Sequence, residues 1–130
     1  MIVLDASAAL EVLLRAPEAP AVERRIFAAG ETLHAPHLID LEVAQVLRRY
    51  VLTRQVAPER CREALEDFAD FPLSRYPHDF MLPRIWELRT NLTAYDGAYV
   101  ALAEALDAPL LTRDERLAGA VGHRARVELV

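Results

Sequence analysis

The sequence predicts an α/β fold with a parallel sheet that is covered by helices on both faces. Short apolar segments at residues 2–4, 32–35, 73–76, 110–112 and 126–129 have the length and composition of buried strands. Helical patterns lie between these segments, and strands that alternate with helices usually pair in parallel. The chain has 130 residues, of which 53% are hydrophobic, so it is sized for one core. We therefore expect residues 1–130 to form a single domain.

The helices follow from apolar spacing and from proline and glycine at their ends. Pro58 is typical of a first helical turn, and Pro83 either occupies such a turn or kinks its helix. Gly30 fits the position that closes the second helix, and Pro36 is expected to stop the second strand. The apolar stripe of the longest helix is predicted to contain Leu41, Ala44, Leu47 and Val51. The predicted helices cover residues 7–15, 21–29, 38–54, 59–71, 78–92 and 95–106, and a short one follows from Asp114.

The basic residues exclude several kinds of chemistry. All 15 of them are arginine, so the chain lacks the lysine that a Walker-type phosphate loop or a Schiff base requires. The formal net charge of −5 argues against nonspecific binding of polyanions by bulk electrostatics. A nucleic-acid substrate stays possible if metal ions and local arginines neutralise its charge.

Cysteine content and hydropathy indicate where in the cell the protein is located. The single cysteine, Cys61, rules out an intrachain disulfide and a thiolate metal cluster, and its expected role is a small packed side chain. No stretch of about 18 uncharged apolar residues is present, and no basic region precedes the apolar N-terminal run. We therefore expect a cytoplasmic protein without a membrane anchor.

Four acidic residues fall where a parallel sheet collects its ligands. Asp5 ends the first strand, Asp114 follows the fourth by two residues, and Glu42 lies in the opening turns of the helix after the second strand. The helix of Asp96 enters the fourth strand at the amino edge of the sheet, so it must begin at the carboxyl edge. Clustered carboxylates repel each other unless a cation compensates them, and Mg²⁺ or Mn²⁺ prefers oxygen ligands. The sequence thus predicts a metal site, and such metals suggest phosphodiester hydrolysis.

Each acid also has a simpler interpretation. Asp5, Asp96 and Asp114 could cap the helices that they open, since aspartate is a preferred N-cap residue. Glu42 could be an ordinary solvated glutamate, although Leu41, Val43 and Ala44 flank it. The spacing of these residues does not decide between the two interpretations.

Three segments carry a resemblance to a known family. IVLDASAAL at the start, PHLIDLEVAQVL in the centre and LTAYDGAYVALAEALDAPLLTRDERLA near the end resemble PIN-domain ribonucleases, most closely the VapC-like toxins of bacterial toxin–antitoxin pairs. The likeness covers nearly the whole chain in order. It implies a three-layer α/β/α fold with a five-stranded parallel sheet and an endoribonuclease that depends on Mg²⁺ or Mn²⁺.

The resemblance also assigns roles to residues and implies partners. The acidic quartet of the family falls on Asp5, Glu42, Asp96 and Asp114, which would serve as metal ligands and catalytic residues. Ser7 and Thr112 match small hydroxyl positions that orient a carboxylate or water. A cognate antitoxin, a homodimer and an RNA substrate, either transfer RNA (tRNA) or ribosomal RNA (rRNA), complete the expectation. Beside this quartet, Arg113 and Arg116 are weaker candidates for phosphate contacts.

Two other functions remain open on the sequence. One is a PIN-domain ribonuclease that matures or degrades RNA without an antitoxin. The other is a noncatalytic interaction module of the same fold, which would leave RNA intact in the presence of Mn²⁺.

Overall fold

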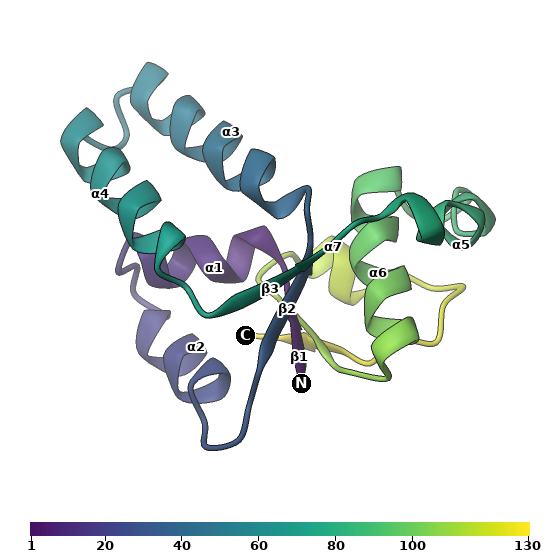
Figure 1. Cartoon of the computed structure of the whole chain (residues 1–130). Helices are drawn as coiled ribbons and strands as arrows, with labels where there is room; N and C mark the ends of the chain where they lie inside the picture. Colours follow the sequence, from purple (N-terminus) through teal and green to yellow (C-terminus); the bar gives the residue numbers. More distant parts are fainter.

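A computed structural model describes all residues from 1 to 130, and its centre is a five-stranded parallel sheet (Figure 1). The strand order is β3-β2-β1-β4-β5. Residue pairs such as Ile2 with Leu33 and Leu4 with Leu111 set the register of the central strand. The strands are β1 (Ile2–Leu4), β2 (Leu33–Pro36), β3 (Leu73–Tyr76), β4 (Leu110–Thr112) and β5 (Val127–Leu129). The predicted parallel sheet and its five strands are confirmed.

Helices cover the sheet on both sides, which makes the three layers that were expected. On one side of the sheet, α1 packs against β4 and contacts α2, α3 and α4. On the other side, α6 packs against β1, β2 and β4, and α5 packs against α6. Figure 1 shows α3 and α4 projecting together away from the sheet. The helices are α1 (Ala6–Leu13), α2 (Ala19–Ile26), α3 (Ile39–Leu52), α4 (Pro58–Ala69), the 3₁₀ helix η1 (Asp79–Met81), α5 (Leu82–Glu87), α6 (Ala94–Leu106) and α7 (Glu115–Ala118). None of these helices has the length and apolarity needed to cross a membrane.

The strand order places a functional site at one edge of the sheet. From β1 the chain adds β2 and then β3 on one side of the sheet, and it later adds β4 and β5 on the other side of β1. The direction in which strands are added therefore reverses between β1 and β4. Every residue of β1 is completely buried, because helices cover both faces of this central strand. Loops that leave β1 and β4 in opposite directions open a crevice at the carboxyl edge. The residues that follow these two strands therefore meet there.

Two boundaries differ from the prediction near the second helix. Helix α2 spans Ala19–Ile26 instead of residues 21–29, because Pro20 fits within its first turn, where no amide donor is needed. Gly30 does not close the helix but lies in the following loop at φ 82°, where glycine is unstrained. Pro36 ends β2 from within the strand and pairs with Tyr76 of β3.

The exposed sides of α3 and α5 also differ from the prediction. Of the predicted stripe of α3, Leu47 is buried but Leu41 is 76% exposed, and Ile39 and Val43 share the buried side with Leu47. The apolar pattern alone could not fix the direction of this stripe, because apolar residues occur on several sides of the helix. The helix predicted over residues 78–92 is divided into η1 and α5, with Pro83 in the first turn of α5. The apolar residues of α5 do not share one side, because Ile85 is buried and Trp86 is exposed.

Candidate active site

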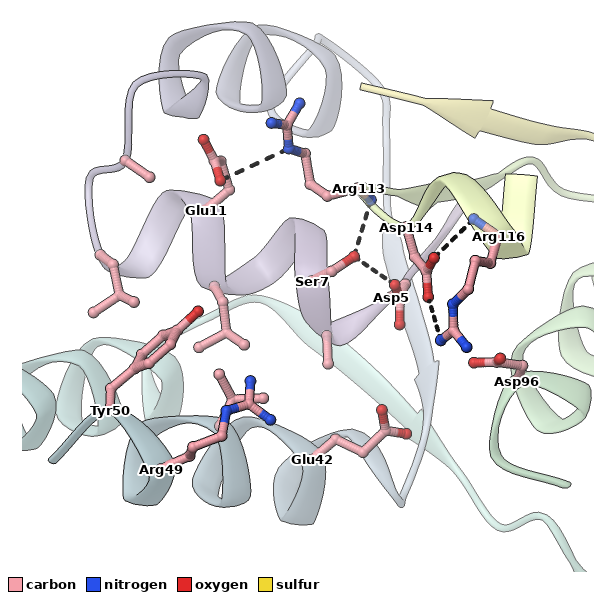
Figure 2. A pocket seen from close by; sticks show the side chains of 15 residues that line it. Asp5, Ser7, Glu11, Glu42, Arg49, Tyr50, Asp96, Arg113, Asp114 and Arg116 are labelled. Carbon is pink, nitrogen blue, oxygen red and sulfur yellow. Dashed lines mark hydrogen bonds and ion pairs between the residues drawn. The ribbon is translucent and has the colours of Figure 1, made fainter. Parts of the chain in front are cut away.

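A cavity of about 520 Å³ opens at the carboxyl edge of the sheet, and all four predicted acids line it (Figure 2). Asp5 comes from the end of β1, Glu42 from α3, Asp96 from α6 and Asp114 from the start of α7. The cavity continues between α1 and α3, where Glu11, Arg49 and Tyr50 are among its lining residues. The winding of the sheet thus gathers carboxylates from four elements around one space.

Asp5 is held rigidly by hydroxyl groups. Its Oδ2 accepts hydrogen bonds from Ser7 Oγ at 2.6 Å and from Thr112 Oγ1 at 2.7 Å. These hydroxyls are in turn fixed by backbone amides, because the Arg113 amide donates to Ser7 Oγ at 2.9 Å and the Asp114 amide donates to Thr112 Oγ1 at 3.0 Å. Asp5 occupies the N-cap position of α1, but its side chain makes no capping hydrogen bond. The capping interpretation of Asp5 is therefore excluded.

Glu42 is the carboxylate with the most unfavourable surroundings. Burial, followed by the negative charge of Asp5, raises its pKa to about 7. Its Oε1 is buried and has no hydrogen-bond partner. A solvated glutamate would have neither property, so that interpretation of Glu42 is excluded. A buried acceptor without a partner is costly, and such atoms often mark the place of a ligand or ion.

Asp96 lies in the first turn of α6 but does not cap it. Thr93 is the N-cap, and its Oγ1 accepts a hydrogen bond from the Asp96 amide at 3.1 Å. The Asp96 carboxylate therefore remains free to face the cavity. Burial raises its pKa, and the charges of Asp5 and Asp114 act in the same direction. The cap expected at the start of this helix exists, but a different residue provides it.

Asp114 combines both roles that were considered for it. Its Oδ1 caps α7 by accepting a hydrogen bond from the Arg116 amide at 2.8 Å. The Arg116 guanidinium pairs with Oδ2 at 3.2 Å and is itself 85% exposed at the mouth of the cavity. Burial opposes ionisation of Asp114, but these contacts with Arg116 outweigh it and hold the pKa below its ordinary value. Asp114 is thus an ionised carboxylate with a fixed orientation.

The structure adds residues that the sequence did not single out. Glu11 is a fifth acid of the cavity, and its carboxylate lies 3.7 Å from the guanidinium of Arg113, which also donates to the Val130 carbonyl. Glu11 is four residues after Ser7 on α1, so helical spacing could have indicated it. Arg49 on α3 also lines the cavity, and it forms no ion pair with an acid.

The donor set suits a hard divalent cation. All candidate ligands are carboxylate oxygens, two of them have raised pKa values, and Glu42 Oε1 lacks a partner. No three acidic, histidine or cysteine side chains converge closely enough to form a ready-made ligand group. Mg²⁺ does not require one, because it usually keeps several waters and binds through one or two carboxylates. The residues present therefore fit such an ion without an all-protein cage.

Comparison with known proteins identifies the family. The PIN domain model matches residues 2–122. Ribonuclease VapC12 of Mycobacterium tuberculosis is 45% identical over 130 residues, a match that covers 100% of this chain and 99% of the relative. The chain belongs to the PIN-domain family of VapC ribonuclease toxins. Ribonuclease VapC9 of the same species is 48% identical over 117 residues, which cover 90% of this chain and 88% of that protein.

Solved structures support the fold of this VapC ribonuclease. PAE2754 from Pyrobaculum aerophilum superimposes with a TM-score of 0.70 at 22% identity and covers 97% of this chain and 81% of its own. A chain of VapBC2 from Rickettsia felis, solved bound to a promoter DNA fragment, gives a TM-score of 0.71 at 16% identity, with 99% and 98% covered. At these identities the likeness concerns the fold alone, and it agrees with the three-layer architecture.

Proposed function

We propose that this VapC ribonuclease is a metal-dependent endoribonuclease toxin whose ligands are Asp5, Glu42, Asp96 and Asp114. The observation that carries this proposal is the meeting of four carboxylates in one cavity, although they are far apart in the sequence. Burial, followed by the charges of the neighbouring acids, raises the pKa of Glu42 and Asp96, and such crowding lowers stability unless a cation compensates it. Mg²⁺ or Mn²⁺ is the proposed ion.

The chain itself supplies orientation and charge. Ser7 and Thr112 both donate to Oδ2 of Asp5, which lines the cavity, so the carboxylate is held in one orientation and Oδ1 is left for a ligand. Arg116 is exposed beside Asp114 and can exchange that carboxylate for a phosphate of RNA, and Arg113 is a second candidate for such a contact. When bound, a divalent cation supplies Lewis-acid stabilisation of the charge that develops on the phosphate. No histidine lines the cavity, so a histidine acid–base pair is not part of this proposal.

Sequencing of RNA 5′ ends tests the proposal. Purified wild-type protein is incubated with total RNA in Mn²⁺ or in EDTA, beside Asp5→Asn and the control Asp67→Asn, which changes an exposed acid on α4. We expect discrete new 5′ ends with wild type and Asp67→Asn in Mn²⁺ only. Equal cleavage by Asp5→Asn, or cleavage that persists in EDTA, would refute the metal-site assignment. The identities of the ends would also show whether tRNA or rRNA is cut.

We propose further that a cognate antitoxin neutralises the enzyme in the cytoplasm. Membership of the VapC ribonuclease toxins supports this, because a structurally similar VapC chain occurs in a VapBC complex, VapBC2 of Rickettsia felis. A ribonuclease of RNA maturation or decay remains the alternative. Expression alone and together with the product of an adjacent small open reading frame separates the two. Growth arrest that the second protein relieves supports the toxin, whereas no effect on growth favours the alternative.

We propose that two copies of the chain associate through an apolar surface beside the active site. This surface contains Leu41, Leu82, Trp86 and Tyr95, each of which is more than half exposed. Two shallow hollows at this surface share Leu38 and Tyr95, so the patch is continuous from α3 to α5 and α6. Large continuous apolar patches commonly mark protein interfaces.

A further inference from the structure

Two buried oxygens beside the acidic cavity have no hydrogen-bond partner. One is Oε1 of Glu42, and the other is the hydroxyl of Tyr99. Tyr99 lies on α6 and its side chain is 0% exposed. The two groups are close enough to influence each other, although their geometry in this structure falls short of a hydrogen bond.

This pair is unusual because each atom could satisfy the other. A buried hydroxyl without a partner loses its hydrogen bonds to water and gains nothing in return. Phenylalanine would fill the same space without this cost, so packing alone does not explain a tyrosine at position 99. Asp96 and Tyr99 are three residues apart on α6 and therefore share one side of the helix. Helix α6 thus carries a carboxylate and a hydroxyl on the same side.

The chemistry of the two groups favours donation from tyrosine to glutamate. A phenol hydroxyl donates one hydrogen bond, and a carboxylate oxygen accepts. Both oxygens are buried and lack a partner, so a bond from Tyr99 to Glu42 would satisfy both. The backbone amide of Ala6, the first residue of α1, also acts on the phenol oxygen. That amide has no acceptor within its own helix.

We propose that Tyr99 is a positioning residue that donates a hydrogen bond to the Glu42 carboxylate when Glu42 turns toward a bound cation. The hydroxyl would then lie between the Ala6 amide, which donates to it, and Glu42, which accepts from it. A rotation of the Glu42 side chain that brings the two oxygens together would satisfy both, because each is buried without another partner. This inference rests on the proposed metal-dependent function and names a residue that acts through one of its ligands.

The test is a comparison of Mn²⁺ binding between wild type and Tyr99→Phe. Partners that orient metal ligands typically change affinity by about 10- to 100-fold when removed. We expect isothermal titration calorimetry to show about 10-fold weaker Mn²⁺ binding by Tyr99→Phe, and a smaller rise in Tm on adding Mn²⁺. In EDTA, its Tm should equal or exceed that of wild type, because the hydroxyl that it removes has no partner.

Tyr76→Phe is the matched control. Its hydroxyl is satisfied, since it lies 2.7 Å from Nδ1 of the buried His34 and outside the acidic cavity. Removing it should lower the Tm in EDTA and leave Mn²⁺ affinity unchanged. A purely structural role for Tyr99 predicts the same behaviour for both variants.

A double-mutant cycle with Glu42→Gln separates direct from indirect effects. If Tyr99 acts through Glu42, adding Tyr99→Phe to Glu42→Gln should not weaken Mn²⁺ binding further. An equal loss in both backgrounds would overturn the inference, as would unchanged affinity in Tyr99→Phe alone. If wild type itself neither binds Mn²⁺ nor cleaves RNA, the proposed function fails and not merely the role of Tyr99.

Discussion

Replacing Glu42 by glutamine should stabilise the metal-free protein at alkaline pH. Burial and the charge of Asp5 raise the Glu42 pKa from its ordinary value of 4.5 to about 7. The folded protein therefore binds a proton more tightly than the unfolded chain does. The stability that comes from protonated Glu42 is fully present below pH 4.5 and is lost as the pH rises through 7. Glutamine has nearly the same shape and does not ionise.

The magnitude follows from the size of the rise. A change from 4.5 to about 7, at about 1.4 kcal/mol for each pKa unit, amounts to about 3 kcal/mol. This is an upper value, because the glutamine amide also needs a hydrogen-bond partner in the same place. We therefore expect Glu42→Gln to increase the free energy of unfolding by about 2 kcal/mol at pH 8.5 and by almost nothing at pH 4.5.

Urea unfolding in EDTA at pH 4.5 and pH 8.5 measures this difference. Glu23→Gln is the control, because Glu23 is exposed on α2 and forms no ion pair, so its substitution should change stability little at either pH. With Mn²⁺ added at pH 8.5, the order should reverse, since wild type gains binding energy that the variant lacks. A gain that is equal at both pH values, or a loss at pH 8.5, would refute the reasoning.

Three further variants test separate features. Thr112→Val removes a buried hydroxyl that donates to Asp5 and accepts from the Asp114 amide, so urea unfolding should show a loss of about 2 kcal/mol that Thr112→Ser largely avoids. Arg49→Ala should raise the KM for RNA and weaken its salt dependence, whereas Arg48→Ala, outside the cavity, should not. Trp86→Glu should shift a dimer to monomer in light scattering while the chain stays folded by circular dichroism, because Trp86 is exposed; a persistent dimer would contradict the proposed interface.

Local pattern was sufficient for most of the fold. Leu73–Tyr76 and Leu110–Thr112 form strands with the predicted bounds, since short apolar runs between helices have few alternatives. The convergence of the four acids also followed from sequence, because it depends only on the order of strands and helices. The start of α2 near Pro20 and the division of residues 78–92 into two helices could not be predicted from the sequence. Proline occurs both just before a helix and within its first turn, so its position does not fix where the helix begins.

What the sequence determined by itself is which residues reach the carboxyl edge of the sheet, because chain order and parallel pairing fix that edge. Only the tertiary structure decided how they behave there. Burial gives Glu42 its raised pKa, Arg116 keeps Asp114 ionised, and Thr93 caps α6 so that the Asp96 carboxylate stays free. Burial and hydrogen-bond geometry depend on side chains from distant segments. No local pattern records them, which is why Tyr99 became visible only in three dimensions.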